Sequence, residues 1–144
     1  MVKEYLSGNA GVHVYRWRLE ACLEGRKWTV NNDADGWIAM SDAFKAFGVR
    51  LVAIDVIGGY ERGLVQTLQA TGLNVARVGM RQALDFARSR DASNKVPRVD
   101  ASVLRDFADA LVSFGPDFDL YLPHRPPSDN SLRRTPRDGR SPRT

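Results

Sequence analysis

The segment Leu51–Ile57 constrains the fold more than any other part of the chain. All of its residues are apolar except Asp55. A strand with one face in solvent would carry polar residues at every second position, so this segment predicts a strand buried on both faces, as in a parallel sheet. A sheet of that kind needs helices on both of its faces. We therefore expect an α/β layered domain.

Three short strands are predicted before this segment. Ala10–Tyr15 is β-prone, residues 16–23 alternate between apolar and polar side chains, and Lys27–Val30 follows a turn at Glu24–Arg26. The alternation is typical of a half-buried strand. Its predicted apolar face consists of Trp17, Leu19, Ala21 and Leu23, and its polar face consists of Arg16, Arg18, Glu20 and Cys22. Together the three strands predict an antiparallel meander.

Helices and strands alternate after the meander. Asn31–Asp33 offers the side chains that begin helices, and apolar residues follow at helical spacing. A second predicted helix ends near Gly72, before a strand over Leu73–Val78. Two more helices are predicted, one with Met80 in its apolar stripe and one that begins near Asp100. The expected order is β-β-β-α-β-α-β-α-α, which indicates βαβ units and a mixed sheet.

The last part of the chain differs from the rest in composition. Residues 115–144 contain six of the 7 prolines and six arginines, without apolar periodicity. Proline at this density interrupts both helices and strands, and so little apolar surface cannot offset the entropy of ordering. We expect a single domain over residues 1–114 and a disordered tail over residues 115–144.

Composition excludes several classes of protein. Cys22 is the only cysteine, which rules out a disulfide scaffold, and two histidines with one cysteine are too few for a zinc cluster. No apolar run reaches the length of a membrane helix, and Met1–Ala10 lacks the apolar core of a signal peptide. A cytoplasmic protein is expected. The formal net charge of +4 suits a nucleic-acid partner.

Asp55 is the most informative single residue for function. It is a carboxylate at the end of an apolar strand, where ligand sites of α/β sheets gather, although it could instead cap the Gly58–Gly59 turn. The paired glycines alone only weakly indicate a phosphate-binding loop, since neither the dinucleotide-binding spacing nor the P-loop spacing of glycines is present. Asp100 could be a site residue or the N-cap of the last helix.

Several strings together resemble one known family. The segment 55–62 resembles its Glu-x-Thr-Gly-Gly-Tyr-Glu, followed at 68–73 by a Leu-x-x-x-Gly-Leu-like stretch. Residues 95–101 resemble its Lys-Thr-Asp-x-x-Asp-Ala, and Gly11–Val14 its opening Gly-Ile-Asp-Val. Over roughly residues 10–114 the chain resembles the RuvC-like N-terminal domain of the DEDD-type transposases of insertion-sequence family 110.

The resemblance implies an RNase H-like mixed sheet and a magnesium site. In this family four carboxylates bind two magnesium ions that promote DNA strand cleavage. Their positions fall here on His13, Asp55, Pro97 and Asp100, so two carboxylates are lost and one is shortened. Asp55 and Asp100 remain as the candidate catalytic and metal-binding residues. Because magnesium needs oxygen ligands, we expect Mg²⁺ binding to be weak or absent.

Two functions of different classes follow from the resemblance. The first is a truncated transposase-like protein, related to metal-dependent DNA strand transfer in transposition and inactive alone. The alternative is a non-catalytic nucleic-acid-binding or dimerising module that regulates intact transposase. The expected partners are DNA, a structured guide RNA, and a second copy or intact transposase, with no membrane. The candidate phosphate contacts are Arg77, Arg81, Arg88, Lys95 and Arg98. A third hypothesis is a small-ligand domain that uses Gly58–Gly59.

Overall fold

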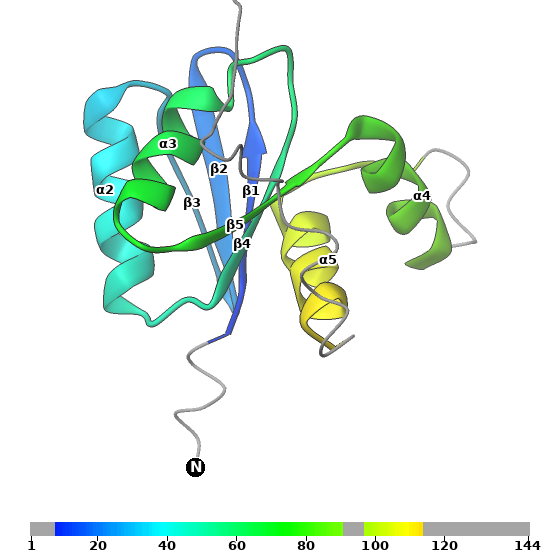
Figure 1. Ribbon diagram of the computed structural model, residues 1–144. Coiled ribbons are helices and arrows are strands. Elements are labelled where there is room, and N and C mark those ends of the chain that lie inside the picture. Colours follow the sequence, from blue (N-terminus) through cyan, green and yellow to red (C-terminus); the bar gives the residue numbers. More distant parts are fainter. Residues whose placement is uncertain (1–7, 91–96, 114–144) are drawn as a thin grey trace, which may run out of the picture.

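The structure, a computed structural model, describes residues 8–90 and 97–113. Its elements are β1 (Ala10–Val14), β2 (Arg18–Leu23), β3 (Arg26–Asn31), α2 (Ala34–Ala46), β4 (Leu51–Asp55), α3 (Arg62–Ala70), β5 (Asn74–Val78), α4 (Met80–Arg90) and α5 (Ala101–Ser113). This order confirms the one predicted from the pattern of the sequence (Figure 1). The predicted tail over residues 115–144 and the candidate residue Lys95 lie outside the described residues.

The strands form one mixed sheet in the order β3-β2-β1-β4-β5. The first three strands pair antiparallel, as the predicted meander requires. β4 then pairs parallel to β1, and β5 pairs parallel to β4. Strands β1, β4 and β5 therefore end at the same edge of the sheet, so residues near their carboxyl ends are brought together.

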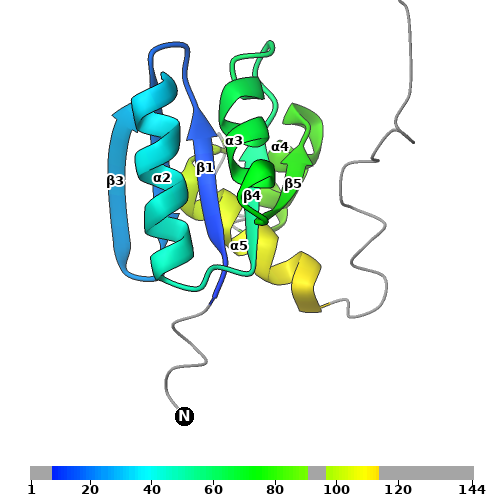
Figure 2. The same ribbon diagram turned by 60° about the vertical axis from the view of Figure 1, so that its left-hand side comes forward.

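Helices cover both faces of the sheet, with α2 and α3 on one side and α5 on the other (Figures 1 and 2). β4 is buried along its whole length, as its composition predicts. Val52 and Ile54 pack in the core beneath α2 and α3, whereas Leu51 and Ala53 pack in the core that α5 completes. The two-sided core explains why polar residues are almost excluded from this strand.

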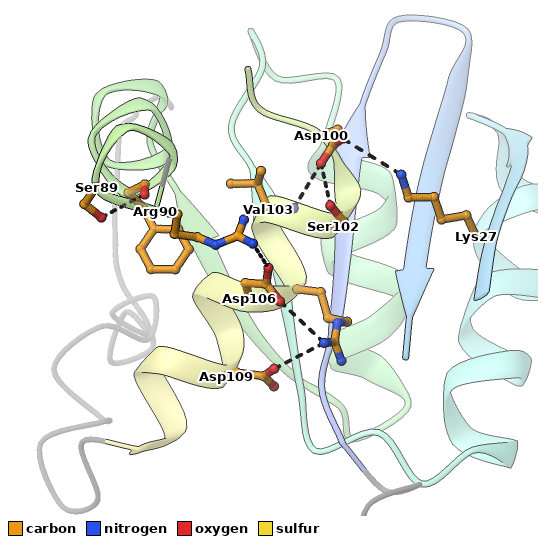
Figure 3. Close-up of polar contacts among 10 residues, drawn as sticks. Lys27, Ser89, Arg90, Asp100, Ser102, Val103, Asp106 and Asp109 are labelled. Atoms are coloured by element: carbon orange, nitrogen blue, oxygen red, sulfur yellow. Dashed lines mark hydrogen bonds and ion pairs between the residues drawn. The ribbon is translucent and has the colours of Figure 1, made fainter. Parts of the chain in front are cut away.

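Helix α4 packs against α5 through an ion pair and an aromatic contact. Arg90 of α4 donates to Asp106 of α5 at 2.6 Å, as Figure 3 shows. The rings of Phe86 and Phe107 meet edge to face, with 5.1 Å between their centroids.

Gly11 allows α5 to lie directly on β1. A Cβ atom at this position would lie 2.2 Å from the backbone nitrogen of Arg105 and 2.3 Å from the carbonyl oxygen of Ala101. Any other residue would push the helix away, because backbone atoms cannot shift as a flexible side chain can. The contact places the beginning of α5 close to the carboxyl half of β1, which contains His13.

Three side chains differ from the sequence prediction. Trp17 was assigned to the apolar face of the second strand, but it precedes β2 and is exposed. Cys22 was assigned to the polar face, but it is buried because α5 packs against that face of β2. Met80, placed in the apolar stripe of its helix, is exposed at the first turn of α4. Tertiary packing overrides the local pattern at Cys22, whereas Trp17 and Met80 are exposed because they lie just before β2 and at the first position of α4.

None of the helices found within residues 8–90 and 97–113 is long and apolar enough to cross a membrane.

Candidate functional site

The buried carboxylate of Asp55 is the centre of the candidate site. Asp55 is the last residue of β4 and is 0% exposed. Its Oδ1 accepts a hydrogen bond from the backbone N–H of Val14 at 2.8 Å, and its Oδ2 accepts one from Nδ1 of His13. Both oxygens are therefore bound by the neighbouring strand β1, and the buried charge is compensated by a fixed dipole and an imidazole.

His13 lies among three carboxylates. Its hydrogen bond to Asp55 raises the pKa of the imidazole above 6.5, which burial alone would lower, and the charges of Asp55, Glu20 and Asp100 add to the increase. Glu20 is the partner of His13 in the β1–β2 register. The side chain of His13 is 16% exposed, so one edge of the ring reaches the surface. The site thus favours an imidazolium cation.

Asp100 caps the last helix. Its Oδ1 accepts hydrogen bonds from the backbone N–H of Val103 and the hydroxyl of Ser102, both at 3.0 Å, and its Oδ2 lies 3.9 Å from Nζ of Lys27 (Figure 3). Burial would raise the pKa of Asp100, but these hydrogen bonds and Lys27 hold the pKa below its usual value. Of the two interpretations that the sequence left open for Asp100, the structure shows the N-cap.

Asp100→Ala should lower the free energy of unfolding by about 1 kcal/mol, since it removes the acceptor for the first turn of α5. Asp100→Asn keeps an acceptor oxygen and should cost less than the alanine variant. Urea denaturation of the two variants and the parent chain tests this prediction. Equal stability of all three would show that the cap does not contribute.

The residues at the four positions that the resemblance assigns to metal ligands do not fit a magnesium ion. The pKa of His13 is raised by its contact with Asp55, and Pro97 has no side-chain ligand. Both oxygens of Asp55 contact groups of β1, and Oδ1 of Asp100 accepts two hydrogen bonds. Within the ranges that the structure describes, no three His, Cys, Asp or Glu side chains are placed to share a metal ion. Magnesium requires several oxygen ligands in octahedral geometry, which this donor set does not supply.

Glu61 is a second buried carboxylate, which the sequence analysis did not single out. It is 1% exposed, and its Oε1 accepts from the backbone N–H groups of Ile57 (3.0 Å) and Gly59 (3.1 Å). Its Oε2 accepts from Nη2 of Arg77 at 3.1 Å. Burial would raise the pKa of Glu61, but the backbone hydrogen bonds and Arg77 outweigh burial and lower it.

The contacts of Glu61 determine the conformation of the loop after β4. Gly58 and Gly59 have positive φ angles of 56° and 92°, which favour glycine. Because Glu61 already binds the N–H groups of Ile57 and Gly59, those donors are not directed at a phosphate. The sequence offers one signal for this role, a glutamate two residues after paired glycines. It does not indicate that the side chain of Glu61 folds back to the N–H groups of Ile57 and Gly59.

The five candidate phosphate contacts have different environments. Arg77 is paired with Glu61, and Arg88 lies 3.3 Å from Asp85 on the same helix. Arg81 at the beginning of α4 and Arg98 before α5 are exposed. Arg81, Arg88 and Arg98 therefore lie on α4 or just before α5, whereas Arg77 is directed to Glu61 at the start of α3. His13 and Asp55 lie near the carboxyl ends of β1 and β4.

Neither the models of known protein families nor the curated proteins contain a match to this chain. We therefore infer the chemistry of the site from the positions and contacts of its own residues. A buried carboxylate binds an imidazole, a second buried carboxylate binds backbone N–H groups of the adjacent loop, and Arg81 and Arg98 are exposed in and next to the two last helices.

Proposed function

We propose that this chain is a transposase-like domain of the RNase H-like (RuvC-like) class that binds nucleic acid without cutting it. The sheet order β3-β2-β1-β4-β5, with an antiparallel meander and two added parallel strands, fits the sheet that the resemblance implies. The positions of the first and second family acids, His13 and Asp55, lie on adjacent strands and contact each other. The position of the fourth, Asp100, lies at the beginning of the helix that packs on β1.

The observation that carries this proposal is the pairing of His13 with Asp55. Strand cleavage by the family needs cations that activate the nucleophile and stabilise the leaving oxygen. Here an imidazole, whose pKa is raised by the contact, occupies the position of one carboxylate and binds the next one. Because His13 replaces one carboxylate and binds the next, the oxygen ligands that a catalytic Mg²⁺ ion needs are missing from this edge of the sheet.

Nucleic-acid binding is supported by charge. The chain carries 21 lysines and arginines against 17 acidic residues, and Arg81 and Arg98 are exposed beside α4 and α5. Contacts of this kind bind phosphates and release counterions, so the affinity should fall linearly with the logarithm of the salt concentration.

Two assays on the full chain test the proposal. Fluorescence anisotropy with labelled DNA and RNA, in single-stranded and duplex form, should show binding that weakens as salt increases. A supercoiled plasmid incubated with the protein and Mg²⁺ or Mn²⁺ should remain uncut. Metal-dependent nicking that disappears in Asp55→Asn would contradict the proposal and indicate an active transposase domain. Absence of binding at low salt would contradict the nucleic-acid part.

A further inference from the structure

Aromatic and arginine side chains, all exposed except the half-buried Tyr15, gather at the β1–β2 connection and the loop after β4. We call this group the aromatic–arginine platform; it consists of Tyr15, Arg16, Trp17 and Arg18 from the β1–β2 connection and Tyr60 from the loop after β4. Trp17 is 73% exposed and Tyr60 is 42% exposed. Large aromatic side chains exposed to this degree indicate an interaction surface when they gather with arginine.

Cation–π contacts join the side chains of the platform in two groups. The guanidinium carbon of Arg16 lies 4.7 Å from the ring centroid of Trp17 and 5.8 Å from that of Tyr60. The guanidinium carbon of Arg18 lies 3.9 Å from the ring centroid of Tyr15. Arg16 thus connects rings from two separate loops, and Arg18 with Tyr15 forms a second cation–π pair next to it in the sequence.

The backbone beneath the platform is fixed by hydrogen bonds. The side-chain amide of Asn32 donates to the carbonyl oxygens of Tyr15 and Tyr60, both at 3.0 Å, and its Oδ1 accepts from the indole N–H of Trp37 at 2.7 Å. The backbone N–H of Asn32 donates to the carbonyl of Trp17 at 3.0 Å. The backbone that carries the aromatic rings is therefore ordered before a ligand binds, which reduces the entropy lost on binding.

The charge of the platform selects an anionic ligand. Arg16 and Arg18 are exposed, and so is Arg62 next to the loop of Tyr60. The acid in that loop, Glu61, is buried and paired with Arg77. A ligand that combines flat π faces with negative charges at regular spacing fits this surface, and single-stranded nucleic acid has both features. A duplex stacks its bases internally and cannot offer their faces.

We propose that the aromatic–arginine platform binds single-stranded nucleic acid, with bases stacked on Trp17 and Tyr60 and phosphates bound by the arginines. This inference rests on the nucleic-acid binding proposed above and specifies its surface and the form of the ligand. Tyr15 connects the platform to the candidate site, since its ring meets that of His13 edge to face at 4.6 Å. A strand held by the platform passes beside the His13–Asp55 pair.

The test compares Trp17→Ala with Phe47→Ala, which removes another exposed ring that lies under an arginine (Arg26, 4.9 Å). Anisotropy is measured with an oligothymidine of about 20 nucleotides and with a duplex of the same length. Trp17→Ala should weaken single-strand binding about tenfold, Trp17→Phe should retain most of it, and Phe47→Ala should leave it unchanged. The effect of Trp17→Ala on duplex binding should be much smaller.

Other outcomes separate this inference from the proposed function. Single-strand binding unaffected by Trp17→Ala, or binding of the parent chain to duplex alone, would overturn the platform and leave the proposed function standing. No binding to either oligonucleotide at low salt would overturn both. If Trp17→Ala instead dissociates a dimer in sedimentation experiments without changing nucleic-acid affinity, the platform is a contact between two copies and the inference is wrong.

Discussion

Asp55→Ala should lower the free energy of unfolding by about 3 kcal/mol. The substitution removes a carboxylate that is 0% exposed and leaves the N–H of Val14 without its acceptor inside the sheet. It also leaves the imidazole of His13 without the partner that stabilises its charge. Urea denaturation near neutral pH measures the loss.

Two controls separate the pair from a general effect of removing charge. Asp55→Asn keeps an oxygen for Val14 and should cost less than Asp55→Ala. Asp42→Ala removes an exposed carboxylate from α2 and should change stability by less than about 0.5 kcal/mol. If Asp55→Ala costs no more than Asp42→Ala, the buried pair does not stabilise the fold.

The His13–Asp55 pair also makes stability depend on pH. The folded state raises the pKa of His13 above 6.5, so the stabilisation is fully present below pH 6.5 and is lost as the pH rises through the folded pKa. In Asp55→Asn this dependence should be much weaker, because the main cause of the pKa increase is removed.

Glu61→Ala should cost about 2–3 kcal/mol. Two backbone N–H groups, of Ile57 and Gly59, lose their acceptor, and the guanidinium of Arg77 loses its partner. The Gly58–Gly59 turn should open, so the amides of Ile57 and Gly59 should exchange with solvent faster while amides in β1 keep their protection. Denaturation and hydrogen exchange together test the prediction.

Glu61→Gln and Glu24→Ala are the matched controls. Glu61→Gln retains an acceptor for the turn and should cost less than Glu61→Ala, and Glu24→Ala removes an exposed glutamate from a turn with little effect. Because the pKa of Glu61 is lowered from 4.5, its stabilisation is present above that pH and is lost as the pH falls through the folded pKa. Unchanged acid stability in Glu61→Gln would contradict this role.

Much of the fold could be predicted because its signals are local. The apolar run of β4 required a core on both faces, and the side chains of Asp33 and Asp100 accept hydrogen bonds at the beginnings of α2 and α5 as N-caps do. Trp17 and Cys22 could not be assigned from alternation. The exposure of Trp17 depends on where β2 begins, and the burial of Cys22 depends on α5, a helix distant in sequence.

The candidate site was predictable only in part. Asp55 is conspicuous as a carboxylate in an apolar strand, but its partner His13 lies 42 residues away in sequence and meets it through the parallel pairing of β1 with β4. Glu61 has no apolar surroundings in the sequence that would mark it as buried. Arg77 is a predicted phosphate contact because it clusters with other cationic residues around one loop-helix region of the sequence, yet its partner in the fold is Glu61.

The most direct test of the account is the pKa of His13, followed by NMR of the imidazole ring with and without millimolar Mg²⁺, with His13→Gln to assign the signal. We predict a pKa above 6.5 that does not change when Mg²⁺ is added, since the imidazole of His13 already binds Asp55. A pKa below 6.5, or one that falls on addition of Mg²⁺, would show that the carboxylates bind the metal ion instead and would contradict the account.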